Sequence, residues 1–112
     1  MNALHKDLVR LTAAAERQAV KDGPWRPGLH LAPPTGWLND PNGLCRFRDE
    51  YHVFYQYAPF DANGGVKFWG HCKSRDLLSW ERCPVMLYSD EPYDVHGAYS
   101  GSALCGEDGL YL

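Results

Sequence analysis

The first part of the chain carries apolar side chains at helical spacing. They form one stripe at positions i, i+4, i+7 and i+11, namely Leu4, Leu8, Leu11 and Ala15. This spacing predicts a helix over residues 2–21 that packs by a single face. Asn2 provides a cap at its start, and Asp22-Gly23-Pro24 predicts its end. We expect this helix to pack against the rest of the chain and to carry no chemistry.

After a connector rich in proline and glycine (residues 23–34), the pattern changes to the alternation typical of strands. Residues 44–47 and 51–57 flank Arg48-Asp49-Glu50, which predicts a β-hairpin with a three-residue loop. Alternation in the second run places Val53, Tyr55 and Tyr57 on one face and His52, Phe54 and Gln56 on the other. Because both faces carry bulky side chains, we expect stacked sheets to cover this strand on both sides.

The later pattern predicts more strands, separated by turns. We expect strands near residues 67–74, 80–82, 98–104 and 110–112, with turns or loops at 61–65, 74–78, 90–97 and 106–109. The fold class is therefore mainly β, preceded by one N-terminal α-helix. Four strands followed by a new hairpin are typical of one propeller blade and the start of a second.

Composition and charge exclude some classes of function but do not assign one. A chain of 112 residues fits one small domain, and its net charge of −3 without a basic stripe argues against nucleic acid as a partner. Aromatic residues make up 13%, with four Trp and seven Tyr. That content suits carbohydrate contacts and a stacked β core equally, so it does not distinguish between them.

The cysteines and the hydropathy of the chain indicate in which cellular compartment the protein is located. Cys45, Cys72, Cys83 and Cys105 show neither a C-x-x-C pair nor the spacing of metal ligands. Their even number permits two disulfides in a secreted protein, but the start of the chain does not have the pattern of a secretory signal. No apolar run approaches the ~20 residues of a membrane helix, so we predict no membrane association. We expect reduced thiols in a cytoplasmic protein.

The stretch with the most chemistry is residues 30–44, centred on Asn39-Asp40-Pro41-Asn42-Gly43. Pro41 biases Asp40 toward extended backbone, and Asn42-Gly43 supplies residues that reverse the chain. A carboxylate is thus predicted at the mouth of a turn, with Trp37 three residues before it. Sugar cleavage needs a positioned carboxylate, amide groups for hydroxyls and an indole face. The alternative is an ordinary surface turn, because all five residues are turn formers.

Further segments follow this motif in a fixed order. They lie at residues 51–59, 68–71, 74–80 and 97–103. Together the segments resemble the opening of glycoside hydrolase family 32, the β-fructofuranosidases that include invertases and sucrose-6-phosphate hydrolases, over about residues 24–112. The resemblance implies a five-bladed β-propeller followed by a β-sandwich, several times this length. We therefore expect a fragment, with an N-terminal helix in residues 1–22 and an incomplete N-terminal part of the propeller in residues 23–112.

The resemblance also implies roles for individual residues. Asp40 matches the nucleophile of a retaining mechanism, which attacks C2 of a fructosyl unit and forms a covalent glycosyl-enzyme. The positions that match substrate-binding residues are Trp37, Asn39, Gln56, Trp69, Tyr99 and Ser100. Structural alternatives remain: an Asx-turn for Asn39, core packing for Trp37 and a hydrogen-bond network for Gln56. We expect His71 to be a hydrogen-bonded core residue.

The general acid/base and the stabilising aspartate of the family lie in Glu-Cys and Arg-Asp-Pro motifs, and neither motif occurs in this sequence. The resemblance implies no metal and no organic cofactor. The expected function is that of the N-terminal part of a β-fructofuranosidase, with sucrose, sucrose 6-phosphate or a short fructan as its small-molecule partner. A non-catalytic carbohydrate-binding remnant and a fructosyltransferase of the same fold are the alternatives, and the sequence leaves the oligomeric state open.

Overall fold

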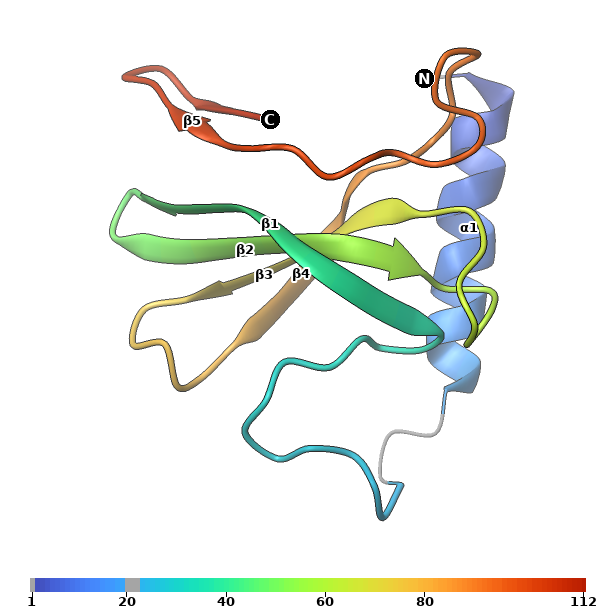
Figure 1. Ribbon diagram of the computed structural model, residues 1–112, viewed down its shortest axis with the longest axis horizontal. Helices are drawn as coiled ribbons and strands as arrows, with labels where there is room; N and C mark the ends of the chain where they lie inside the picture. Colours follow the sequence, from blue (N-terminus) through green and yellow to red (C-terminus); the bar gives the residue numbers. More distant parts are fainter. Residues whose placement is uncertain (1, 20–22) are drawn as a thin grey trace.

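The computed structural model describes residues 2–19 and 23–112. Its elements are helix α1 (Ala3–Gln18) and strands β1 (Trp37–Phe47), β2 (Glu50–Ala58), β3 (Phe68–Ser74), β4 (Glu81–Leu87), β5 (Leu104–Cys105) and β6 (Leu110–Tyr111). Strands β1 to β4 form one antiparallel sheet in chain order, and β5 and β6 form a separate hairpin (Figure 1). The fold is mainly β with one helix, as the hydropathy pattern predicts.

Helix α1 begins where the sequence predicts. The Asn2 side chain accepts a hydrogen bond of 2.7 Å from the backbone N–H of His5, which satisfies one of the free donors of the first turn. Ala19 already has extended backbone (φ −64°, ψ 140°) and ends the helix. The helix therefore ends earlier than the predicted residue 21; residues 20–22, which include Asp22 of the predicted stop, lie outside the described residues.

The helix buries a different face from the predicted apolar stripe. Thr12 is 2% exposed, whereas Leu4 and Leu11 of the predicted stripe are 46% and 44% exposed and only Leu8 and Ala15 are half-buried, so the predicted packing face is wrong in part. The sheet presents polar groups to the helix: the hydroxyl of Tyr57 donates to the Glu16 carboxylate at 3.0 Å. Burial and the neighbouring Glu16 raise the pKa of Tyr57, which keeps it a neutral donor. This polar contact lies on the side of the helix that faces the sheet, and a pattern of apolar spacing does not register it.

The β1–β2 hairpin turns more tightly than predicted. Arg48 and Asp49 have φ values of 49° and 61°, so the loop has two residues, both in the left-handed region that such hairpins need. Glu50 is the first residue of β2 and pairs with Phe47. The strand predicted at 80–82 is also longer, because β4 extends to Leu87.

Both faces of the sheet are covered, and the predicted alternation along β2 is confirmed. One face carries a core of Phe54, Trp69 and Ala98, and the other a core of Tyr55, Tyr57 and Cys72. Stacked sheets are not what covers both faces. Helix α1 lies against the side with Tyr55 and Tyr57 (Figure 1), and the chain from Ala98 onward covers the other.

The strand predicted at 98–104 is present only as Leu104–Cys105. The residues before it satisfy their backbone groups against the large sheet instead of a neighbouring strand. The N–H of Ala98 donates to Lys67 O at 2.8 Å, and the carbonyls of Tyr99 and Gly101 accept from Trp69 Nε1 and from the Gly43 N–H. These bonds tie the segment 98–101 to the sheet without a regular ladder.

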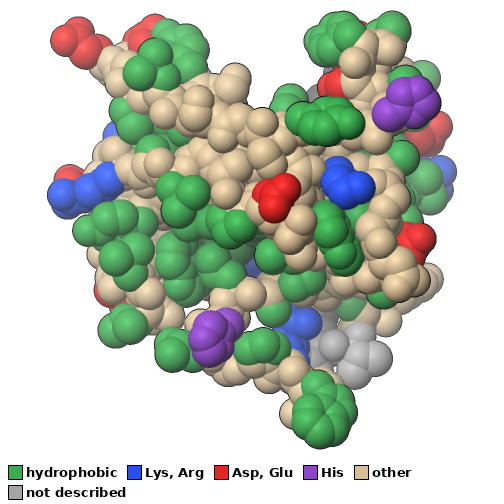
Figure 2. Space-filling model, viewed as in Figure 1, with side chains coloured by type: hydrophobic (Ala, Val, Ile, Leu, Met, Phe, Trp, Pro, Cys, Tyr) green, Lys and Arg blue, Asp and Glu red, His purple; other side chains and the backbone are tan. Residues whose placement is uncertain are grey.

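Many apolar side chains stay on the surface, and Figure 2 shows them gathered over one face with only scattered charges among them. The most exposed large ones are Trp25, Leu29, Leu44, Leu78, Tyr93, Tyr99 and Leu104. Leu44 and Leu104 are 64% and 70% exposed and belong to β1 and β5. A surface of this kind favours association with further protein.

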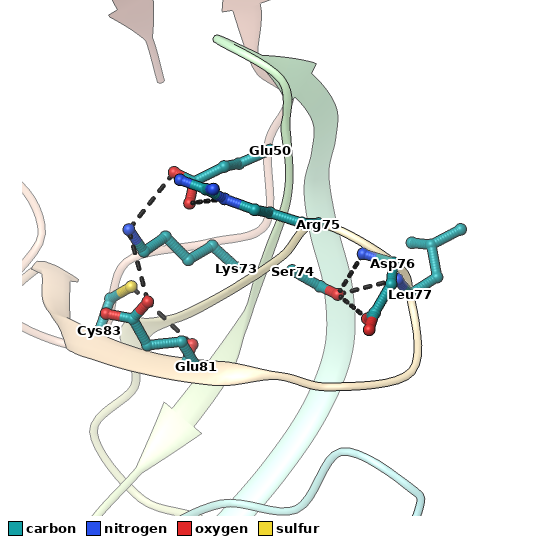
Figure 3. Close-up of polar contacts among 8 residues, drawn as sticks. All are labelled: Glu50, Lys73, Ser74, Arg75, Asp76, Leu77, Glu81 and Cys83. Atoms are coloured by element: carbon teal, nitrogen blue, oxygen red, sulfur yellow. Dashed lines mark hydrogen bonds and ion pairs between the residues drawn. The ribbon is translucent and has the colours of Figure 1, made fainter.

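The turn between β3 and β4 is held by Asp76 and Ser74; Figure 3 shows the Ser74 hydroxyl bonded to Asp76 and Leu77, together with the ion pairs of Lys73 and Arg75. The Asp76 carboxylate accepts from the backbone N–H groups of Ser79 and Leu78 at 2.7 and 2.9 Å and from the Ser74 hydroxyl at 3.0 Å. The N–H of Ser79, that of Leu78 and the Ser74 hydroxyl lower the pKa of Asp76 from 3.8 to about 2.

We predict that Asp76→Asn lowers the melting temperature at neutral pH. The difference in melting temperature between variant and wild type should become smaller as the pH falls. The folded pKa lies below the unfolded one, so the stabilisation is complete above pH 3.8 and is lost as the pH falls toward about 2. Thermal unfolding followed by circular dichroism from pH 7 to pH 2 measures this. Glu107→Gln, an exposed carboxylate in the β5–β6 turn, is the control. Parallel curves for wild type and Asp76→Asn would contradict the role of the charge.

Candidate functional site

The motif residues 37–43 form the first half of β1 rather than a turn. Trp37 lies opposite Ala58 and Asn39 opposite Gln56 in the ladder with β2. The prediction that Asn42-Gly43 reverses the chain is wrong, because β1 continues through them to Phe47. The chain reverses only at residues 48–49.

Asp40 lies at a bulge in β1. The register shifts between Asn39 and Pro41, which leaves Asp40 without a partner on β2. Its φ is 31°, so the predicted extended backbone is also wrong. The preference that Pro41 imposes on the preceding residue is overcome here, because Pro41 has no N–H for the ladder and the strand accommodates it with an extra residue. Aspartate is one of the few residue types that tolerates this conformation.

A second irregularity follows at once and is fixed by glycine. Gly43 has a φ of 55°, and a Cβ there would lie 2.8 Å from Cδ2 of Phe54. Asn42 is 5% exposed, and its side-chain amide donates to Asp40 O at 3.3 Å. The bulge that orients Asp40 is therefore held by Asn42 and Gly43, which follow it in β1, and by Phe54 in the core of β2.

A cavity of about 310 Å³ opens beside the bulge, large enough for a sugar ring. Its lining residues are Trp37, Asn39, Asp40, Gln56, Lys67, His96, Gly97, Ala98, Tyr99 and Ser100. Six of the seven residues predicted for the site line this one cavity, and only Trp69 does not. Four separate parts of the chain build it: β1, β2, Lys67 in the connection between β2 and β3, and the segment that begins at residue 96.

Gln56 joins two of these parts. It is 4% exposed in the middle of β2, and its Nε2 donates to Ala98 O at 2.9 Å and to Ser100 Oγ at 3.2 Å. The structural role considered for this amide is therefore present. Both amide protons are used by the protein, which leaves the amide oxygen as the group able to accept from a sugar hydroxyl.

Trp69 supports the cavity from behind. It is 3% exposed in the core with Phe54, and its Nε1 donates to Tyr99 O at 2.8 Å. It does not line the cavity itself, and its contact with sugar stays a prediction. Tyr99 itself is 89% exposed at the cavity, where its ring is free to cover a ligand.

His71 lies in the core, as predicted. Its Nε2 is 2.9 Å from Nδ1 of His52, and its ring stacks on Phe54 with 4.4 Å between centroids. Burial, with a smaller contribution from His52, lowers the pKa of His71 from 6.5 to about 4, so the ring is neutral at physiological pH. It does not line the cavity, and a neutral buried imidazole is poorly placed for proton transfer there.

The sequence did not indicate Lys67 and His96 as part of the site, and it indicated Gly97 and Ala98 only as members of the segment 97–103. The only signal for Lys67 and His96 is adjacency, since Lys67 directly precedes Phe68-Trp69 and His96 directly precedes the Gly97–Ser100 stretch. Gly97 has a φ of 136°, and a Cβ there would lie 3.3 Å from Lys67 N. The loop backbone therefore packs directly on Lys67.

Among residues 2–19 and 23–112, no cluster of three or more His, Cys, Asp or Glu is arranged to hold a metal ion. The four cysteines are free thiols. No helix in the described part of the chain is long and apolar enough to span a membrane.

Comparison with known proteins agrees with this geometry. A model of the glycosyl hydrolases family 32 N-terminal domain matches residues 30–112. The chain belongs to glycosyl hydrolase family 32. It is 45% identical to the sucrose-6-phosphate hydrolase of Zymomonas mobilis over 102 residues, which are 89% of this chain and 20% of that protein.

Solved structures of family 32 enzymes superpose on the chain. The Bombyx mori GH32 β-fructofuranosidase matches with a TM-score of 0.82 at 33% identity, over 98% of this chain and 23% of that one. The sucrose-6-phosphate hydrolase from Lactobacillus gasseri matches with a TM-score of 0.79 at 38% identity, over 90% and 20%. A mutant of the Bombyx mori enzyme was solved in complex with sucrose. The chain spans about a fifth of the length of the curated relatives it matches.

We predict that Gly43→Ala lowers the free energy of unfolding by more than about 1 kcal/mol, because it adds backbone strain and a clash with Phe54. Urea denaturation of both proteins measures the difference. Gly28→Ala is the matched control, since a Cβ at Gly28 meets nothing within 4 Å, and it should leave the urea midpoint unchanged. Equal midpoints for Gly43→Ala and wild type would show that the bulge adapts to a side chain.

Proposed function

We propose that this chain supplies the fructosyl-binding half of the active site of a retaining β-fructofuranosidase, with Asp40 as its nucleophile. The observation that carries the proposal is the placement of Asp40 by the β1 bulge in one cavity with Asn39, Gln56 and Ser100. Membership of family 32 and the sucrose complex of a related enzyme support a β-fructofuranoside as the ligand.

The chemistry assigned to each residue follows from its groups. The Asp40 carboxylate attacks C2 of the fructosyl unit as the C2–O glycosidic bond breaks, and the glycosidic oxygen leaves with a proton from the acid/base. Water then adds to C2 of the covalent glycosyl-enzyme and releases the Asp40 carboxylate. Asn39 and the amide oxygen of Gln56 bind fructosyl hydroxyls, and Ser100 Oγ, held by Gln56, adds a third polar contact. Trp37 and Tyr99 cover the apolar C–H face of the sugar.

A retaining mechanism needs a second carboxyl group, about 5–5.5 Å from the nucleophile. Within the described residues, Asp40 is the only carboxylate that lines this cavity. The relatives are roughly five times as long as this chain, and we propose that the acid/base belongs to the part of the enzyme that these 112 residues do not cover.

The fold proposal follows the same logic. We propose that β1 to β4 form the first blade of a five-bladed propeller and that β5 and β6 begin the second, with the N-terminal segment that carries helix α1 (residues 1–22) ahead of it. The antiparallel order of β1 to β4 and the apolar side chains left exposed on β1 and β5 support this arrangement.

A carbohydrate-binding role without catalysis is the second candidate. The single carboxylate in the cavity favours it for the 112 residues on their own. The two candidates differ in an observable way: a binding module tolerates loss of Asp40 as long as sugar binding remains, whereas a retaining hydrolase does not.

A cytoplasmic location stays a prediction.

We predict that Asp40→Ala, in the enzyme that contains this chain together with its acid/base, lowers kcat for sucrose by a factor on the order of 10⁴ or more. The nucleophile is lost, and no other carboxylate of the described cavity lining can replace it. Asp7→Ala, an exposed carboxylate on α1, should leave kcat unchanged. A purified Asp40→Ala enzyme with near-normal turnover would exclude Asp40 as the nucleophile.

We also predict that the 112-residue chain releases no measurable glucose from sucrose. Loss of general acid catalysis alone costs a factor of about 10²–10⁴, and an open cavity does not exclude water. The assay uses protein purified away from host sucrose-cleaving enzymes, with Asp40→Asn beside it. Glucose release that disappears in Asp40→Asn would mean that a second carboxyl reaches the site, for example through self-association.

A further inference from the structure

Two of the four free thiols, Cys45 of β1 and Cys105 of β5, belong to strands of different sheets that lie side by side (Figure 1). The Gly43 N–H of β1 donates to Gly101 O at 3.4 Å. Farther along both segments, the Cys105 thiol donates to Arg46 O at 3.5 Å. The two segments therefore run past each other in the same direction, and Cys45 lies between their two contacts.

The side chain of Cys45 points to the face of the large sheet on which β5 and β6 lie. Cys45 is opposite His52 in the ladder between β1 and β2, and directly opposed residues share a face. His52 precedes Phe54 by two residues, so both are on one face of β2. Leu110 of β6 packs against the core that contains Phe54. Cys45 thus faces the β5–β6 hairpin.

The side chain of Cys105 points back toward the large sheet. Cys105 is opposite Leu110 in the hairpin and shares its face, which is the one packed on the sheet. Its thiol reaches the carbonyl of the residue that follows Cys45. Burial, with a smaller contribution from Cys105, raises the pKa of Cys45 from 9.0 to about 11. The two side chains therefore converge on one place between β1 and β5.

The two thiols differ in access, and the surroundings point to redox chemistry. Cys105 is exposed and Cys45 is half-buried, so a reagent reaches Cys105 first. An accessible thiol beside a second, resolving thiol is the arrangement of redox-sensitive pairs. Among residues 2–19 and 23–112, no third His, Cys, Asp or Glu is arranged with the pair to hold a metal ion.

We propose that Cys45 and Cys105 form a reversible disulfide between β1 and β5 when the protein meets a low-molecular-weight disulfide such as oxidised glutathione. The Cys105 thiolate attacks one sulfur of the oxidant, which forms a mixed disulfide and releases one thiolate. The Cys45 thiolate then attacks the Cys105 sulfur and releases the second. The two cysteines lose two protons and two electrons, and the oxidant is reduced to two thiols.

The bond ties the strand that carries Asp40 to the strand that follows the cavity wall. Residues 98–100 line the cavity, and β5 begins at Leu104. A cross-link between residues 45 and 105 closes a loop of roughly 60 residues and restricts mainly the unfolded chain. The melting temperature of the oxidised protein should therefore exceed that of the reduced protein by on the order of 10 °C.

The test is oxidation of the purified, reduced 112-residue chain with excess oxidised glutathione at low protein concentration. Cleavage at both basic and acidic residues separates the four cysteines, so mass spectrometry of the peptides identifies the pair. We expect one disulfide within the chain, between Cys45 and Cys105, which dithiothreitol reverses. The same oxidation in urea is the control, and the unfolded chain should not favour this pair.

Variants separate the two steps of the reaction. Cys45→Ser should stop at a mixed disulfide on Cys105, because the resolving thiol is absent. Cys105→Ser should form no disulfide within the chain. Cys83→Ser, at a half-buried cysteine of β4, is the matched control and should oxidise as wild type does. Circular dichroism of the reduced variants shows whether each is folded, and the peptide analysis of wild type does not depend on them.

The proposal has several results that would overturn it. They are a different cysteine pair in the oxidised wild type, only mixed disulfides, only disulfides between chains, or the same pairing in urea as in the folded protein. An oxidised protein that melts at or below the temperature of the reduced one would also overturn it, because the folded strands would then not accommodate the bond. None of these measurements uses a sugar, so their outcome is independent of the proposed function.

Discussion

A proline inside a paired strand has no N–H to donate, and the site depends on how β1 meets this constraint. The strand inserts Asp40 as an extra residue before Pro41, which shifts the register against β2 and takes Asp40 out of the ladder. Asp40 then adopts a positive φ, and its side chain joins the cavity lining. Strain of this kind persists only where the surroundings enforce it, and here the buried Asn42 and the contact of Gly43 with Phe54 do so.

The second wall of the cavity is irregular chain, and its residues 98–100 are fixed by Gln56, Trp69 and Lys67. Gln56 holds Ala98 and Ser100, Trp69 holds Tyr99, and Lys67 O accepts from Ala98 N–H. All three anchors come from strands β2 and β3 or from the residue before β3. A regular sheet therefore positions an exposed segment, which is how a loop can carry binding groups without losing precision.

The sequence predicted which residues form the site better than it predicted the backbone conformation of the site. Alternation along 51–57 predicted both core faces, because side chains in a strand point to opposite sides. Six of seven expected residues share the cavity because order along the chain, in a meander of adjacent strands, keeps them close. The bulge was missed because the local preferences of Pro41 and Asn42-Gly43 favour a turn, and pairing with β2 overrides them. Lys67 and His96 were missed because nothing local distinguishes a cavity lysine from a surface one.

The helix illustrates a different limit. Hydropathy placed Leu4 and Leu11 on the buried side, yet both are exposed, and Glu16 of α1 accepts a hydrogen bond from the sheet. At its N-terminal end, His5 Nδ1 is 2.5 Å from the Asp90 carboxylate and Asn2 Nδ2 donates to Asp90 O at 3.0 Å. Asp90 lies at the start of the loop that carries His96. This loop ends where Gly97 packs on Lys67. A helix to which the sequence assigned no chemistry thus fixes one end of the loop that lines the cavity, and Lys67 fixes the other.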